Sequence, residues 1–279
     1  MYVDESDRYF DYTSVKVTED EFNELRDLIY DVAGISLQDR KKTLVSGRLS
    51  KRLRYHRLTT YTAYIDLVKS NHKELEMMIN LVSTNETYFF RENAHFDFLA
   101  SDILPSIPRT EHFRVWSAAS SSGEEAYTTA MVIAHANLGF SWEIFGTDIS
   151  TRILETAKQG LYPITAADKI PTEYLKKYCR KGVREMTGTM LIDKELRSNT
   201  SFQYMNLNDP PWPNIGTFNV IFLRNVMIYF DKETKKQLVL NVIQRLKPGG
   251  YLFLGHSESL LGIEHNLITV RPATYRKKS

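Results

Sequence analysis

The chain has 279 residues, of which 42% are hydrophobic and 25% charged, an ordinary globular composition that provides for a sizeable core. The formal net charge is only +2, so overall charge indicates no particular class of partner. The single cysteine, Cys179, excludes an internal disulfide and a cysteine metal cluster, and it suits a reducing cytoplasm.

Residues 1–15 are polar and aromatic without periodicity, and we expect them to form a flexible tail. They are acidic and lack the apolar run of a signal peptide. No later stretch approaches the roughly 18 apolar residues that a transmembrane helix needs. We therefore expect a cytoplasmic protein that does not insert into a membrane.

Residues 16–83 predict a small all-helical domain. Thr18 to Glu21 fits a capping box, and Gly34 is a suitable C-cap for the helix that follows. The three further expected helices cover residues 40–57, 60–69 and 73–82. The expected buried side of the first of these is Leu44, Val45, Leu49 and Leu53.

The helix expected over 40–57 carries eight Lys or Arg residues and no Asp or Glu. Charge runs are usually solvated, but like charge at this density favours an acidic partner. Nucleic acid is possible, although Tyr55 is the only aromatic residue available for base stacking. An acidic protein surface fits as well.

After Thr84 apolar strands and amphipathic helices alternate, which predicts a doubly wound α/β fold with a mostly parallel sheet. We expect helices over 92–104, 124–137, 151–159 and 232–246, and strands over 113–119, 142–148, 218–224 and 250–255. Residues 246–250, LKPGG, predict a turn before the last of these strands. Residues 161–200 interrupt the rhythm and predict an inserted β-subdomain, and the C-terminal residues predict an edge strand or hairpin.

A strand, a loop of small residues at 118–123, a helix and a second strand ending at Asp148 form a unit typical of nucleoside binding. The loop is not GxGxxG, so a nucleoside without a pyrophosphate is favoured, and S-adenosylmethionine is the common one. Asp148 would accept hydrogen bonds from the ribose, or else cap the next helix. Glu124 would contact the cofactor, or else be a carboxylate that is only stabilised there by the helix dipole.

Two further segments carry polar residues among aromatic ones. Arg91, in the segment 84–92, could pair with the carboxylate of an amino-acid-bearing cofactor, or else form an interdomain salt bridge or be a solvated arginine. Arg224, Asn225 and Tyr229 follow a buried strand, where open α/β sheets bind ligands. The sequence Asp209-Pro-Pro-Trp212 is similar to a motif of amino methyltransferases, but it precedes the strand instead of following it.

Five segments in order resemble the CheR family, the chemoreceptor glutamate O-methyltransferases of bacterial chemotaxis. They are TNETYFFRE (84–92), WSAASSSGEEAY (116–127), FGTDIS (145–150), NVIFLRNVMIYFD (219–231) and LKPGGYLFLGHSES (246–259). The resemblance covers roughly residues 16–275. It implies a class I, Rossmann-like methyltransferase fold over 84–279, with S-adenosylmethionine as cofactor and glutamates on the cytoplasmic helices of chemoreceptors as substrate. One departure is Ala126, where the family usually has proline.

The resemblance also implies roles for individual residues. The implied cofactor-binding residues are Asn85, Thr87, Arg91, Glu124, Asp148, Asn206, Leu207, Asn225 and Val226. The candidates for catalysis and for orienting the acceptor are Arg91, Tyr229 and Arg224. The basic helix would dock on the acidic receptor bundle through Arg48, Arg52 and Arg54.

No metal is expected, because the seven histidines show no metal-binding spacing. We also expect a monomer that does not bind nucleic acid. Two alternatives of other classes remain. The first is a nucleic-acid methyltransferase that uses the basic helix as its binding arm. The second is a non-catalytic cofactor-binding module that signals through the helical domain.

Overall fold

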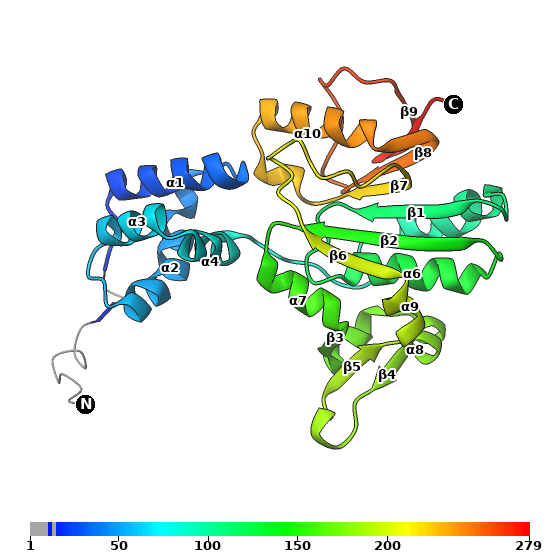
Figure 1. Ribbon diagram of the computed structural model, residues 1–279, viewed down its shortest axis with the longest axis horizontal. Helices are drawn as coiled ribbons and strands as arrows, with labels where there is room; N and C mark the ends of the chain where they lie inside the picture. The colour runs from blue at the N-terminus through cyan, green and yellow to red at the C-terminus, as the bar shows by residue number, and fades with distance from the viewer. Residues whose placement is uncertain (1–10, 13–14) are drawn as a thin grey trace. The chain divides into compact units, whose positions relative to one another are not determined.

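The computed structural model describes residues 11–12 and 15–279, so the expected tail lies almost wholly outside the described residues. The chain divides into two compact units, Met1–Thr84 and Asn85–Ser279 (Figure 1). Among the described residues, no helix combines the length and apolar character that crossing a membrane requires.

The first unit is all-helical, as predicted. Its helices are α1 (Glu19–Ala33), α2 (Lys42–His56), α3 (Tyr61–Ser70) and α4 (His72–Val82). The capping box is present, because the Thr18 hydroxyl accepts from the Glu21 N–H at 3.2 Å and the Glu21 carboxylate accepts from the Thr18 N–H at 2.9 Å. Gly34 ends α1 with φ of 70°, a conformation that favours glycine.

The buried side of α2 differs from the prediction at one position. Val45, Leu49 and Leu53 are buried, but Leu44 is 40% exposed. Residues four apart share a helix face, whereas a neighbour in sequence is turned by about 100°. Leu44 therefore lies off the stripe that the other three define.

Two of the arginines expected to dock on a receptor stabilise the helical unit instead. Arg48 donates to the carbonyls of Leu81, Val82 and Ser83 at the end of α4, at 2.7 Å in the case of Val82. Arg52 binds the buried Glu74 through two nitrogens, at 2.8 and 2.6 Å. The prediction of a docking role is therefore corrected for Arg48 and Arg52, which hold α2 against α4.

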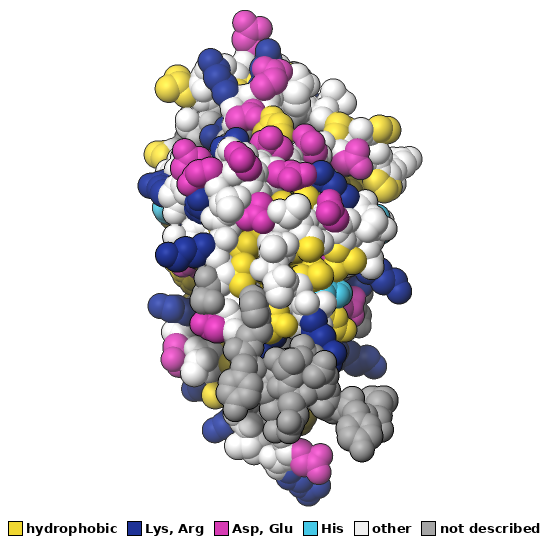
Figure 2. All heavy atoms as spheres, turned by 90° about the vertical axis from the view of Figure 1, so that its left-hand side faces the viewer, with side chains coloured by type: hydrophobic (Ala, Val, Ile, Leu, Met, Phe, Trp, Pro, Cys, Tyr) yellow, Lys and Arg dark blue, Asp and Glu magenta, His cyan; other side chains and the backbone are white. Residues whose placement is uncertain are grey.

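The outward basic groups of α2 are Lys51 and Arg54, which are both exposed. By contrast α1 carries six acidic residues and one arginine in its sequence EDEFNELRDLIYDVA. Acidic side chains also gather in a band on the side of the molecule shown in Figure 2. Of these two helices, only α2 therefore has the charge that suits an acidic partner.

The second unit contains a sheet of seven strands in the order β6-β2-β1-β7-β8-β10-β9 (Figure 1). The strands are β1 (His112–Ser117), β2 (Ser141–Asp148), β6 (Thr200–Tyr204), β7 (Phe218–Leu223), β8 (Leu246–Leu254), β9 (Leu267–Arg271) and β10 (Thr274–Lys277). All pairings are parallel except those of β10 with its two neighbours. The expected C-terminal hairpin is thus present as β9 and β10.

Helices cover both faces of this sheet, as the doubly wound prediction requires. The covering helices include α5 (Ala94–Phe98), α6 (Glu124–Ala136), α7 (Thr151–Gln159) and α10 (Lys232–Gln244). Phe222 packs in the core that includes α6, while its neighbour Ile221 packs in the core that includes α10. Alternate residues of a buried strand therefore supply two separate cores. The prediction of a turn at residues 246–250 is wrong, because β8 (Leu246–Leu254) already begins at Leu246.

The insert forms a three-stranded antiparallel sheet in the order β3-β5-β4, as expected. Its strands are β3 (Leu161–Pro163), β4 (Cys179–Lys181) and β5 (Thr189–Ile192), and its helices are α8 (Thr172–Tyr178) and α9 (Lys194–Ser198).

Candidate active site

The candidate site lies at the carboxyl ends of β1, β2 and β7. From β1 the chain builds outward through β2 to β6 and then returns to β7 on the other side of β1. This reversal of strand order is where open α/β sheets bind ligands. The sequence after each of these strands therefore decides what the site can hold.

The loop after β1 is held in a tight, strained conformation against the end of β2. The Ser120 N–H donates to the Thr147 carbonyl at 2.8 Å, and the Ser121 N–H donates to Asp148 Oδ2 at 2.9 Å. Ser121 has φ of 48°, which is uncommon for a residue other than glycine. The Ser121 hydroxyl donates to the Asn85 carbonyl at 3.2 Å. The loop, Asn85 and Asp148 thus meet at the ends of β1 and β2.

Asp148 is a buried clamp and not a helix cap. Its Oδ1 accepts from the Ser150 N–H at 2.9 Å, and the cap of α7 is Ser150, whose hydroxyl accepts from the Ile153 N–H. Burial raises the pKa of Asp148 above its usual value, although backbone N–H donors oppose the rise. A carboxylate has about four acceptor positions, and the backbone N–H groups of Ser121, Ile149 and Ser150 occupy up to three of them, so acceptor capacity remains for the ribose.

Glu124 begins α6 and is also buried, with 9% exposure. Burial raises the pKa of its carboxyl group, while the Ser122 hydroxyl, which donates to it at 2.6 Å, acts in the opposite direction. Within the described part of the chain, the hydroxyl oxygen of Ser120 is buried without a hydrogen-bond partner. Buried polar atoms are rarely left unpaired, so Ser120 indicates a polar ligand at this loop.

Glycines keep the base of the site closely packed. A Cβ on Gly146 would lie 2.5 Å from the ring of Phe202 and 3.1 Å from the Ser120 hydroxyl oxygen. Gly123 has φ of 95°, which other residues rarely adopt. These positions let β2 and the small-residue loop approach each other closely.

The segment before α5 has two further residues with positive φ, Phe90 at 57° and Glu92 at 56°. Such conformations cluster at functional sites, where the surrounding structure enforces them. Between them Arg91 is half-buried, and its guanidinium donates to the Glu86 carbonyl at 2.6 Å. Arg91 makes no ion pair with any described residue, so the structure does not support the salt-bridge alternative. Thr87 lies in the same segment and is half-buried.

Arg224 is placed differently from the prediction. Its side chain is 2% exposed and forms ion pairs with Glu92 and Glu125, each at 3.0 Å. Its Nη2 also donates to the carbonyl of Arg91. The guanidinium is therefore engaged by protein groups on all three nitrogens, so it positions the segment around Arg91 instead of presenting a charge to an acceptor.

The pKa values of Glu92 and Glu125, the two acids that pair with Arg224, are shifted in opposite directions. Burial raises the pKa of Glu125, and the Arg224 charge acts against that rise. Burial would also raise the pKa of Glu92. However, Arg224, the Asn225 side chain and the backbone N–H of His256 together hold the pKa of Glu92 below its usual value. Arg224 thus stabilises the ionised form of both acids.

Asn225 and Val226 follow β7, as expected, and Asn225 has φ of 56°. The Asn225 side chain donates to Glu92 Oε1 at 3.2 Å. A short 3₁₀ turn at Met227–Tyr229 then carries Tyr229, which is half-buried.

Sequence reasoning missed Glu258, which holds this segment in place. Its buried carboxylate accepts from the backbone N–H groups of Asn225, Met227 and Gly255, each at 2.8 Å. Burial raises the pKa of Glu258, although these donors oppose the rise. An acid three residues after a glycine at the end of β8 is the signal that could have identified it.

Asn206 and Leu207 follow β6 at the same edge of the sheet. The Asn206 carbonyl accepts from the indole N–H of Trp212 at 3.1 Å, and Leu207 is 8% exposed. Trp212 is itself buried, with its ring 5.4 Å from that of Trp116. The Asp-Pro-Pro-Trp sequence thus lies in the connection before β7, where Trp212 is buried and residues 209–211 are exposed.

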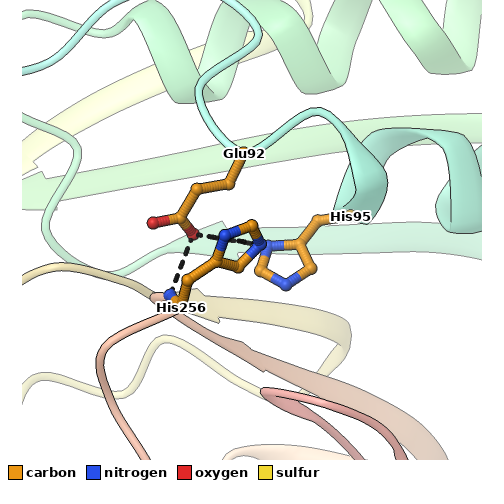
Figure 3. Close-up of side chains that lie close together, drawn as sticks. All are labelled: Glu92, His95 and His256. Atoms are coloured by element: carbon orange, nitrogen blue, oxygen red, sulfur yellow. Dashed lines mark hydrogen bonds and ion pairs between the residues drawn. The ribbon is translucent and has the colours of Figure 1, made fainter.

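Glu92 and His95, at the start of α5, and His256, after β8, lie close together (Figure 3), and their potential ligand atoms lie within 4.8 Å of one another. His95 is buried, and burial lowers its pKa to about 4, so its ring is neutral near pH 7. Arg224 and the His256 N–H already bind the Glu92 oxygen that faces the rings. A divalent cation would have to share that oxygen with a guanidinium, so this cluster does not change the expectation of no metal.

Comparison with known proteins accounts for this arrangement. Residues 85–276 match the family model "CheR methyltransferase, SAM binding domain", and residues 20–83 match "CheR methyltransferase, all-alpha domain". The chain belongs to the CheR methyltransferase family. The family resemblance and the class I methyltransferase fold predicted from the sequence are therefore confirmed.

Relatives in this family match almost the whole chain. The "Chemotaxis protein methyltransferase" of Borreliella burgdorferi is 37% identical over 95% of this chain and 96% of its own length. The protein of the same name from Escherichia coli is 38% identical over 91% and 88%, respectively. The chain is accordingly an S-adenosylmethionine-dependent methyltransferase of the chemotaxis type.

Proposed function

We propose that this CheR methyltransferase esterifies glutamate side chains on the cytoplasmic helices of chemoreceptors. The observation that carries the proposal is the meeting of Asp148, Glu124 and the Ser120 loop at the strand ends of a chain that matches chemotaxis methyltransferases along its length. The residues fit S-adenosylmethionine, because the unpaired Ser120 hydroxyl and the buried acids require polar partners.

The chain's own residues would bind and orient both reactants. Asp148 would accept from the ribose hydroxyls, and Glu124 would face the amino group. Arg91 would leave the Glu86 carbonyl to bind the cofactor's carboxylate in a bidentate contact. Asn206 and Leu207 would flank the adenine, while Asn85, Thr87, Asn225 and Val226 would complete the pocket.

S-adenosylmethionine supplies a sulfonium methyl group, which the substrate carboxylate takes up as a methyl ester while sulfur keeps the bonding electron pair. A glutamate has a reference pKa of about 4.3, so it is already ionised at neutral pH and no general base is needed. Catalysis then depends on positioning and on removing water from the carboxylate. Tyr229, on the segment that Glu258 holds, would orient that acceptor.

The proposal predicts which product the enzyme makes. Incubated with radiolabelled S-adenosylmethionine and the cytoplasmic fragment of a chemoreceptor, the enzyme should transfer label to the fragment. The label should be released as methanol by mild alkali, because methyl esters hydrolyse where N-methyl groups do not. Label in an oligonucleotide, or cofactor binding without any transfer, would instead support one of the two alternatives.

We also infer that α2 docks the substrate through its outward charges. The double change Lys51→Glu and Arg54→Glu should raise the KM for the receptor fragment about tenfold at low salt and less at high salt. The dissociation constant of S-adenosylhomocysteine should not change. Arg48→Glu and Arg52→Glu form the contrasting pair, because they should lower the melting temperature of the helical unit. An unchanged KM in the Lys51→Glu and Arg54→Glu variant would show that these side chains are solvated and do not dock the substrate.

A further inference from the structure

We propose that a groove beside the active site binds an acidic, amphipathic helix of the protein substrate, an inference that rests on the proposed function. The groove has a volume of about 790 Å³. It is formed by the 3₁₀ turn after β7, the first turns of α10 and the loop 257–263. These three segments lie at the carboxyl ends of β7 and β8, where the acceptor must approach.

The groove presents apolar side chains to solvent. Ile228 is 51% exposed and Leu261 is 93% exposed, and the two come from different segments of the wall. A single exposed leucine is ordinary on a protein surface. Two aliphatic side chains that line one groove, together with the half-buried Ile263, form the kind of surface that receives the apolar face of a helix.

The same groove is lined by three lysines and three acids, and the two sets differ in whether they have partners. Lys232, Lys235 and Lys236 line it, and none of the three forms an ion pair with any residue in the described ranges. Lysines at the start of a helix oppose the helix dipole, so the stability of α10 does not explain them.

The acids of the groove are already engaged. Asp231 caps α10, Glu233 accepts from Gln237 at 3.1 Å, and Glu258 is saturated by backbone N–H groups. The lysines are thus the charged groups of the groove that lack an ion-pair partner among the described residues, which favours an occupant that is acidic on one side and apolar on the other. A glutamate-bearing receptor helix has this chemistry.

The groove is continuous with the candidate site through two of its lining residues. Met227 and Glu258 line it, and the carboxylate of Glu258 fixes the N–H groups of Met227 and of Asn225, a cofactor-site residue. A helix seated in the groove would thus lie beside the segment that carries Tyr229. This arrangement would place an acceptor glutamate next to the reacting methyl group.

Ile228→Asp and Leu261→Asp test the groove, because both side chains are exposed and neither change disturbs the core. Each removes apolar contact and adds a charge that repels an acidic helix. We expect the affinity for the receptor fragment, measured by fluorescence anisotropy, to weaken at least about tenfold, with a matching rise in KM. S-adenosylhomocysteine should bind as it does to the unchanged enzyme. The matched control is Ile268→Asp on β9, since Ile268 is 50% exposed and lies outside the groove.

The outcomes separate this inference from the proposed function. If the unchanged enzyme methylates the fragment and both groove variants keep its affinity and KM within twofold, the groove is not the docking surface. If the unchanged enzyme binds the fragment without esterifying it, the proposed function fails, and loss of binding in the variants still supports the groove. Absence of both binding and methylation overturns the two together. Tighter binding of an oligonucleotide than of the fragment, lost on Lys232→Glu and Lys236→Glu, would overturn the assignment of the occupant.

Discussion

Replacing Asp148 by asparagine should weaken the binding of S-adenosylhomocysteine by about 100-fold or more. A hydrogen bond from a ribose hydroxyl to a charged acceptor is worth about 1.5–3 kcal/mol, and the variant loses that charge. The side-chain NH2 group of asparagine is a donor, so it would also face a backbone N–H group from which Asp148 accepts, such as that of Ser121 or of Ser150. Isothermal titration calorimetry measures the loss directly.

The control for this change is Asp193→Asn in the insert. Asp193 caps α9 by accepting from the Glu195 N–H at 3.0 Å, so it has the role that Asp148 was alternatively given. Asparagine caps helices about as well as aspartate, and the control should bind S-adenosylhomocysteine normally. Normal binding by Asp148→Asn as well would leave Asp148 as a purely structural clamp of the loop.

The pH dependence of binding should follow from the same burial. The Asp148 carboxyl group accepts more strongly from ribose when it is ionised, and burial raises its pKa. Affinity should therefore be full above that raised pKa and should fall as the pH is lowered through it, sooner than for an exposed aspartate. Glu124, whose pKa burial also raises, should account for the dependence that remains in Asp148→Asn.

The sequence predicted this part of the site well because its signals are local. An apolar strand, a loop of small residues and an acid at the end of the next strand are read within about 30 residues, and parallel strands bring their carboxyl ends together. The register of β1 with β2, in which Ser117 pairs with Gly146, then places the Ser120 loop against Asp148.

The errors concern interactions between distant residues. Arg224 follows a strand, as ligand-binding residues do, but its partner Glu92 lies 132 residues away, and no sequence pattern joins them. Arg48 and Arg52 lie in a basic run that suggests a solvated or docking face, yet Glu74 and the end of α4 bind them. A charge pattern shows which residues are ionised and not which of them are paired inside the fold.

The strained backbone of the site could also not be predicted from the sequence. Phe90, Glu92 and Asn225 adopt positive φ values although none of them is glycine. The hydrogen bonds of Glu92 to Arg224 and Asn225, and of Glu258 to the backbone N–H groups of Asn225 and Met227, enforce these conformations. Such strain arises only when tertiary contacts outweigh local preference.

Replacing Arg224 by methionine should destabilise the catalytic unit by about 3–5 kcal/mol in its free energy of unfolding. Methionine replaces the aliphatic stem of the side chain but leaves Glu92 and Glu125, each 14% exposed, without a cation, and removing one partner of a buried ion pair has a cost of this size. Urea unfolding measures the difference. Arg180→Met is the control, because Arg180 is 64% exposed in its pair with Asp193, and surface pairs are worth only about 0–1 kcal/mol.

The deficit of Arg224→Met should shrink as the pH falls. Without the guanidinium, both carboxyl groups lose a charge that lowers their folded-state pKa values, while the burial that raises those values remains, so both pKa values rise. Groups with raised pKa values favour the folded state once they are protonated, so the variant regains stability on acidification. The unchanged enzyme loses stability there, because the pKa of Glu92 is lowered by its partners.

This pH dependence distinguishes a positioning role from contact with the substrate. A residue that only oriented the acceptor could be replaced with little loss of stability, and the KM for the receptor fragment would rise instead. A stable Arg224→Met variant with a high KM would therefore restore the role that the sequence indicated. An unstable variant that recovers in acid would show that Arg224 holds the Arg91 segment and Asn225 in place through two buried carboxylates.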